Sequence, residues 1–178
     1  MAASKIILLV INLVGGTAVI GSYIWGISSH QQGANALWGG IPTSTRSLYT
    51  VSMLLSAIGY FAFIYYTLFQ MDSVNVKIAG TLNYSLLYAI FIFILLPSIL
   101  WMPLTFSYLV NHSQITWIAV RVVLVLVAIG SISLVWALLS LQPRPSGLAY
   151  WLAVVGASYF AFHTTVLDAL LWPVLFRK

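Results

Sequence analysis

The sequence predicts an all-α, polytopic membrane protein in which five transmembrane helices form one bundle. The chain has 178 residues, of which 62% are hydrophobic and only 5% are charged. Soluble domains carry about 25% charged residues, so a soluble fold of this composition would have too few polar residues to cover its surface. A lipid-facing exterior removes that difficulty. We therefore expect an integral membrane protein with a single transmembrane domain over residues 1–178.

Five stretches of the chain are long and apolar enough to cross a bilayer, which takes about 20 residues. The predicted spans are 6–27, 47–70, 83–109, 115–141 and 148–174. The longest connection is 28–46, where Gly39, Gly40 and Pro42 disfavour regular structure. Because the number of spans is odd, the two termini are expected on opposite sides of the membrane.

The seven basic residues predict neither a nucleic-acid partner nor an orientation in the membrane. They are scattered, and only two of them are neighbours, so the chain has no basic patch of the kind that binds nucleic acid. Apart from Arg121, which lies within a span, three basic residues flank each side of the predicted bundle, and this even balance sets no orientation. These six are Lys5, Lys77 and Arg144 on the N-terminal side, and Arg46, Arg177 and Lys178 on the other.

Several kinds of chemistry are disfavoured by composition and spacing. The chain has no cysteine, which excludes disulfides, thiolate metal sites and cysteine nucleophiles. His30 and His112 fall in connections and His163 falls in a span, so we expect no metal centre built from histidine and carboxylate. No paired carboxylates, glycine-rich phosphate loop or Ser-His-Asp spacing stands out, which favours a protein that is not an enzyme.

Small residues at helical spacing predict close helix packing in two spans. Small side chains let neighbouring transmembrane helices approach closely. They are Ser52, Ser56 and Gly59 in the second span, and Ala153, Gly156, Ala157 and Ala161 in the fifth. We expect each set to form a packing seam.

Asp168 is one of two acidic residues and lies inside the fifth span. A carboxylate at membrane depth costs about 2.5–3.5 kcal/mol on insertion scales, so it usually has a partner. Arg121 lies about as far inside the fourth span as Asp168 lies inside the fifth, roughly 9 Å from the same face. We predict a structural ion pair between Arg121 and Asp168. In the alternative, Arg121 reaches the headgroups and Asp168 is protonated or bonded to water.

His163 precedes Asp168 by five residues in the same span. In an α-helix this spacing turns the two side chains about 140° apart, so we expect them on different faces. A proton relay through both residues therefore has little support. The simplest expectation is a His163 that bonds to Ser or Tyr, and the alternative is an axial ligand to haem or another tetrapyrrole.

Aromatic residues mark candidate ligand contacts. Trp38, in the long connection, is either an interfacial anchor or a lid over one mouth of the bundle. Tyr60 lies in the aromatic half of the second span, where it suits a stacking wall. Trp101 lies between Pro97 and Pro103, and the two prolines predict a bent helix that faces a cavity or a polar neighbour.

The run LWMPLTF at 100–106 and the five-span, tryptophan-rich layout resemble the translocator protein / tryptophan-rich sensory protein (TspO/MBR) family. The residues that match are Trp38 and Pro42 in the first connection, Trp101, Pro103 and Phe106 in the third span, and Trp136 late in the fourth. At Ser98 the chain differs from the family, which usually has asparagine there. The resemblance implies a helical bundle, often dimeric, that binds porphyrins, sterols or similar flat hydrophobic molecules.

The leading prediction is an integral membrane protein that binds a small, flat, porphyrin- or sterol-like ligand in an aromatic pocket. Trp38 would be the lid, Tyr60 and Trp101 the walls, and His163 the polar handle. One alternative is a structural or assembly subunit of a larger membrane complex. A further alternative is a small membrane enzyme in which His163 and Asp168 transfer protons on a sterol-like substrate.

Overall fold

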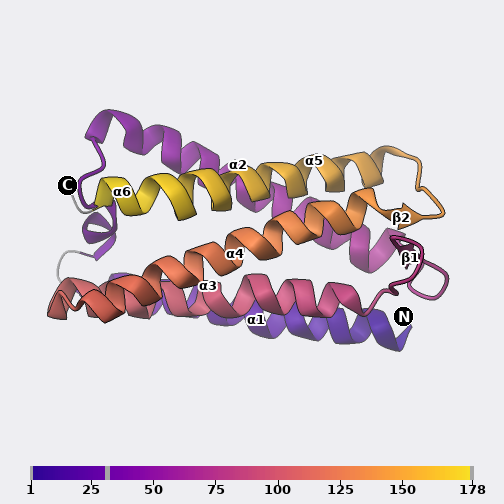
Figure 1. Cartoon of the computed structure of the whole chain (residues 1–178), viewed down its shortest axis with the longest axis horizontal. Helices are drawn as coiled ribbons and strands as arrows, with labels where there is room; N and C mark the ends of the chain where they lie inside the picture. The colour runs from indigo at the N-terminus through magenta and orange to yellow at the C-terminus, as the bar shows by residue number, and fades with distance from the viewer. Residues whose placement is uncertain (1, 31–32, 177–178) are drawn as a thin grey trace.

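The computed structural model describes residues 2–30 and 33–176 and confirms the predicted all-α bundle (Figure 1). Five helical segments in this part of the chain are long and apolar enough to cross a membrane. They are α1 (Ala3–Ser28); α2 (Thr43–Tyr65), continued by the π-helix η2 (Tyr66–Gln70); α3 (Leu86–Asn111); α4 (Gln114–Leu139); and α5 (Leu148–Phe162), continued by the π-helix η3 (His163–Leu171) and by α6 (Trp172–Phe176). Each predicted span overlaps one of these segments.

The connections are more ordered than their composition predicts. The first contains a 3₁₀-helix, η1 (Gly33–Trp38), where we expected no regular structure. At the end of the bundle opposite α6, two connections pair as an antiparallel sheet of β1 (Lys77–Ile78) and β2 (Leu141–Gln142) (Figure 1). Strands of two residues are too short to leave an alternating pattern in the sequence, so this sheet could not be predicted.

The helices pack in pairs around α4. Helix α2 packs against α5, α1 packs against α3, and α4 contacts α3, α5 and η3. Figure 1 shows α2 and α5 along one side of the molecule, α1 and α3 along the other, and α4 between them. The N and C termini lie at opposite ends of the bundle, as an odd number of spans requires.

The outer faces of the helices carry exposed, large apolar side chains. Examples from four helices are Val14 (66% exposed), Phe61 (71%), Val110 (67%) and Ile115 (80%). Contiguous apolar surface of this extent is unfavourable in water, whereas the acyl chains of a bilayer solvate it. The exposed surface and the five long helices together indicate an integral membrane protein.

The closest backbone approach between α2 and α5 occurs at Gly59 and Gly156. A Cβ atom added at Gly59 would lie 2.6 Å from the Gly156 carbonyl oxygen, and one added at Gly156 would lie 2.7 Å from that of Gly59. The neighbouring Ser56 and Ala157 are buried in the same seam. This contact confirms that the small residues of the second and fifth spans form a packing face.

Replacement of Gly59 by alanine is expected to destabilise the bundle by about 1–3 kcal/mol, because the added methyl group meets backbone that cannot rotate away. Thermal unfolding in detergent would measure the loss. Gly16→Ala is the matched control, since a Cβ atom at Gly16 has no neighbour within 4 Å. Equal unfolding temperatures for the two variants would contradict the close contact.

Candidate functional site

Two aromatic and apolar clusters divide the interior of the bundle. The larger one occupies the half nearer the β-sheet and contains Phe63, Tyr84 and Phe91. The other lies toward α6, and we call it the end cluster. Its aromatic members are Tyr49, Tyr108, Trp117, Trp172 and Phe176, with Trp38 and Trp101 packed against it. Polar side chains from α2, α5 and η3 meet next to the end cluster.

Four of these polar residues form a connected series that we call the polar chain: Tyr159, Ser52, His163 and Asp168. The Tyr159 hydroxyl donates to Ser52 Oγ at 3.0 Å, and Ser52 Oγ lies 2.9 Å from His163 Nδ1. His163 Nε2 lies 3.6 Å from Asp168 Oδ2. Because Ser52 Oγ accepts the hydrogen bond from the Tyr159 hydroxyl, its own O–H can donate to Nδ1, and in that tautomer the Nε2–H of His163 faces Asp168.

The prediction that His163 and Asp168 lie on different faces is wrong. It assumed α-helical geometry, but both residues belong to the π-helix η3. In a π-helix the backbone hydrogen bonds join residues i and i+5, so side chains five positions apart lie nearly above one another. The wider turn therefore brings the imidazole and the carboxylate together.

The predicted ion pair between Arg121 and Asp168 does not form in the described part of the chain, where the only ion pair joins His163 and Asp168. Arg121 is exposed on α4, whereas its neighbours Val120 and Leu124 face the interior. Equal depth in two neighbouring helices does not fix the rotation of either helix about its axis. The outward direction of Arg121 agrees with the alternative in which it reaches the headgroups.

The Asp168 carboxylate is poorly satisfied for a group at this depth. It accepts no hydrogen bond shorter than 3.5 Å from any described residue, and 35% of its side chain is exposed, compared with 7% for His163. The Tyr23 and Tyr49 hydroxyls lie within electrostatic range of the carboxylate. An acceptor that is left without donors in a membrane span is costly, and it is therefore available to a ligand.

Aromatic rings from three helices form a series that begins at Tyr23, whose hydroxyl lies within electrostatic range of Asp168. The ring centroids of Tyr23 in α1 and Trp101 in α3 are 5.7 Å apart, and those of Trp101 and Trp172 in α6 are 5.6 Å apart. Both contacts are edge-to-face, a favourable arrangement for aromatic pairs. We call the group formed by Asp168, Tyr23, Tyr49, Trp101 and Trp172 the Asp168 site.

Unpaired polar atoms accompany these rings. The Trp101 indole nitrogen and the hydroxyls of Thr105 and Thr165 are buried without a hydrogen-bond partner among residues 2–30 and 33–176. Buried polar atoms that lack a partner are uncommon in proteins. The Trp101 N–H is a donor and the Asp168 carboxylate is an acceptor, so this end of the bundle offers both kinds of polar contact.

Trp38 lies over the end cluster, where a lid was expected. Its ring meets Tyr49 edge-on at 6.3 Å, and the Arg46 guanidinium lies 5.5 Å from the Trp38 ring centroid. The connection is also fastened to α6, because the Trp172 indole N–H donates to the Leu37 carbonyl at 3.0 Å. The first connection and the last helix therefore close this end of the bundle together.

Tyr60 lies apart from the other predicted ligand residues. Its hydroxyl donates to Asn12 Oδ1 at 2.6 Å, and its ring packs against Phe63 and Phe91 in the larger cluster. Along α2 it follows Ser52 by eight residues, which is roughly 12 Å. The structure therefore brings Trp38, Trp101 and His163 toward one end of the bundle and leaves Tyr60 in the other half.

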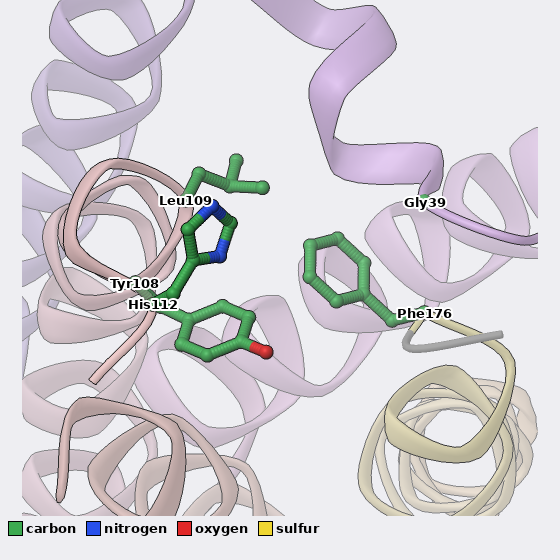
Figure 2. Close-up of a pocket in the computed structure, with 5 residues that line it drawn as sticks. All are labelled: Gly39, Tyr108, Leu109, His112 and Phe176. Atoms are coloured by element: carbon green, nitrogen blue, oxygen red, sulfur yellow. The ribbon is translucent and has the colours of Figure 1, made fainter. Parts of the chain in front are cut away.

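A small hollow opens at the mouth of this same end. Its volume is about 330 Å³, and Figure 2 shows the Phe176 ring facing Tyr108 and His112 across it. Gly39 and Leu109 complete its lining. Its volume is at the lower limit for small-molecule sites. A second hollow of about 370 Å³ lies between α4 and α5 and is lined mainly by apolar side chains.

His163 is poorly placed to bind a haem iron. Axial ligation needs a free ring nitrogen, but Nδ1 of His163 is bonded to Ser52 and Nε2 faces Asp168. The His163 residue is also buried, with 5% of its surface exposed. Within the described ranges, no three His, Asp or Glu side chains come together as a metal site.

Ser52, Tyr159 and Tyr23 were not predicted to take part in the site. For Ser52 the sequence did hold a signal. Ser52 lies seven residues before Gly59, and His163 lies seven residues after Gly156. If Gly59 and Gly156 mark the point where two antiparallel helices cross, residues that lie equally far from that point along each helix are at the same height in the bundle. Ser52 and His163 are such a pair.

No family model, curated protein or solved structure matches this chain. The resemblance to the translocator protein / tryptophan-rich sensory protein family therefore stays a prediction.

The polar chain predicts a measurable coupling between α2 and α5. Ser52→Ala removes the partner of two buried groups, the Tyr159 hydroxyl and the His163 ring, and should lower the free energy of unfolding by about 1–3 kcal/mol. In a double-mutant cycle, Ser52→Ala and Tyr159→Phe should be non-additive by about 0.5 kcal/mol or more. Ser133→Ala is the control, because Ser133 is only partly buried and its hydroxyl donates to a carbonyl within α4. Additive losses would contradict a connected chain.

A second cycle tests the partner of Asp168. His163→Gln and Asp168→Asn should be non-additive in the free energy of unfolding, because the two side chains are in contact. Arg121→Gln and Asp168→Asn should add within about 0.3–0.5 kcal/mol. If instead the Arg121 and Asp168 variants were non-additive and the His163 and Asp168 variants were additive, the result would support an ion pair between Arg121 and Asp168.

Proposed function

We propose that the protein binds a flat hydrophobic molecule, of porphyrin- or sterol-like shape, at the Asp168 site. The observation that supports this function is that aromatic rings in contact with one another lie in the same end of the bundle as a carboxylate that accepts no hydrogen bond from a described residue. The rings come from α1, α2, α3 and α6. Ligand sites of this class combine apolar and aromatic walls with a few well-placed polar groups.

Each part of the site has a physical role in this proposal. Trp101 and Trp172 give large rigid rings against which a flat molecule packs at little cost in side-chain entropy. The Trp101 N–H and the Asp168 carboxylate are the polar contacts that set its orientation. His163 is then a positioning residue that holds Asp168, in place of the direct polar handle that the sequence predicted.

The first connection, which lies over the end of the bundle that holds the Asp168 site, also supports the proposed function. Trp38 covers Tyr49, and the carbonyl of its neighbour Leu37 accepts a hydrogen bond from Trp172, a member of the site. A ligand bound beside Trp172 would therefore touch the element that carries the lid. Loops fixed over one end of a rigid scaffold commonly control access to binding sites.

Octaethylporphyrin, which has no carboxylate, should quench the tryptophan fluorescence of the purified protein saturably, and cholesterol should compete with it. Trp101→Phe removes the unpaired N–H and should weaken binding about 3- to 10-fold, the value of one hydrogen bond. Trp151→Phe is the control, because Trp151 is 48% exposed near the start of α5. Quenching that does not saturate, or equal weakening in both variants, would contradict this function.

A further inference from the structure

We propose that the Asp168 site selects flat ligands that carry a positive charge, so that its natural ligand is a lipophilic organic cation. This inference rests on the proposed function and narrows its ligand class. It follows from three observations: no arginine or lysine among the described residues pairs with Asp168, aromatic rings lie in the same part of the bundle, and the Asp168 side chain is partly exposed.

The first observation concerns charge. Among the residues that the structure describes, the basic group paired with Asp168 is the His163 ring at 3.6 Å, which is uncharged unless protonated. Arg46 is used elsewhere, because its Nε donates to the Ile41 carbonyl at 3.2 Å and its guanidinium lies over the Trp38 ring. Arg121 is exposed on α4. No arginine or lysine in the described part of the chain forms an ion pair with Asp168, so a ligand cation would meet an uncompensated acceptor.

The second observation concerns the rings. Tyr23, Tyr49, Trp101 and Trp172 belong to the same site as the carboxylate. The faces of Trp and Tyr attract cations, most strongly where water is excluded, and aromatic cages with a nearby carboxylate suit alkylated ammonium groups. The same rings also stack on a flat aromatic ligand. An anionic ligand of equal shape would be repelled by Asp168.

The third observation concerns access. The Asp168 side chain is 35% exposed, although it lies eight residues before the end of α6. A structural carboxylate that served only to join helices would be closed off by its partners, as His163 is. Asp168 instead keeps free acceptor oxygens at a depth where lipid-soluble molecules reside.

The other three members of the polar chain position the Asp168 carboxylate without touching the ligand. Tyr159 and Ser52 hold the His163 ring, and the Nε2–H of that ring faces one carboxylate oxygen. The other oxygen of Asp168 is left for the ligand. A neutral, protonated Asp168 would show no preference for a cation, and the experiment below separates these two states.

The experiment compares two ligands of one shape and different charge. 10-Methylacridinium is a permanent cation, and acridine, with the same ring system, is neutral at mildly alkaline pH. Both are fluorescent and are titrated into the intact detergent-solubilised protein. We expect the cation to bind at least about tenfold more tightly than acridine. We expect Asp168→Asn to abolish that preference, so that the cation binds the variant no more tightly than acridine does.

The matched control is Asp72→Asn, which removes the only other acidic side chain, in the exposed connection before β1, where it bonds to Asn75. This variant should keep the full preference for the cation. Equal binding of both ligands by the wild type, or a preference that survives in Asp168→Asn, would overturn the cation inference alone and leave the proposed function standing. Saturable binding of neither ligand would overturn both. If Asp168→Asn does not fold, the wild-type preference over acridine decides the question.

Discussion

The contact between Gly59 and Gly156 is the constraint on which the rest of the site depends. Only two glycines let the backbones of α2 and α5 approach this closely. Seven residues along each helix from this crossing, Ser52 and His163 meet at 2.9 Å. Serine has one heavy atom beyond Cβ, so a wider separation of the helices would leave its hydroxyl out of reach. A packing contact in the lipid-facing bundle thus sets the geometry of a buried polar group.

The second determinant is the change of helix type at His163. From this residue to Leu171 the segment is a π-helix, and the residues after it are turned relative to an uninterrupted α-helix. The change stacks His163 on Asp168, and it also directs Trp172 toward Trp101 and the first connection. π-Helical turns occur often at functional sites, and here one segment arranges both the polar and the aromatic part of the site.

Hydropathy and residue spacing were sufficient to predict the architecture. The five spans follow from the length of the apolar runs, and the seam of α2 and α5 follows from small residues at helical spacing. The predicted pairing of Arg121 with Asp168 rested on an equal number of residues from the ends of their spans, which says nothing of the direction of either side chain. The rotation of each helix about its axis could not be predicted, because nearly every face of these helices is apolar and no separate apolar stripe marks the side that faces the interior.

The site itself was predicted only in part, for the same physical reasons. Trp38, Trp101 and His163 lie toward one end of the bundle as expected, whereas Tyr60 belongs to the larger cluster. The second half of α2 is rich in aromatic residues, so its sequence does not indicate which of the two clusters a given ring joins. The contact between His163 and Asp168 was missed because a π-helix has no periodic signature in an apolar sequence. Only the equal spacing of Ser52 and His163 from the two glycines pointed toward the polar chain.

The depth of Asp168 has an electrical consequence. The carboxylate lies eight residues inside the end of α6, which is roughly 12 Å, or about 40% of the hydrocarbon thickness. A charge that reaches the Asp168 carboxylate from the α6 end of the bundle crosses about the same fraction of the transmembrane voltage. Since a full crossing at 100 mV changes the free energy by about 2.3 kcal/mol per charge, this share amounts to somewhat less than 1 kcal/mol. A membrane potential would thus act directly on the occupancy of a single carboxylate, with no helix required to move.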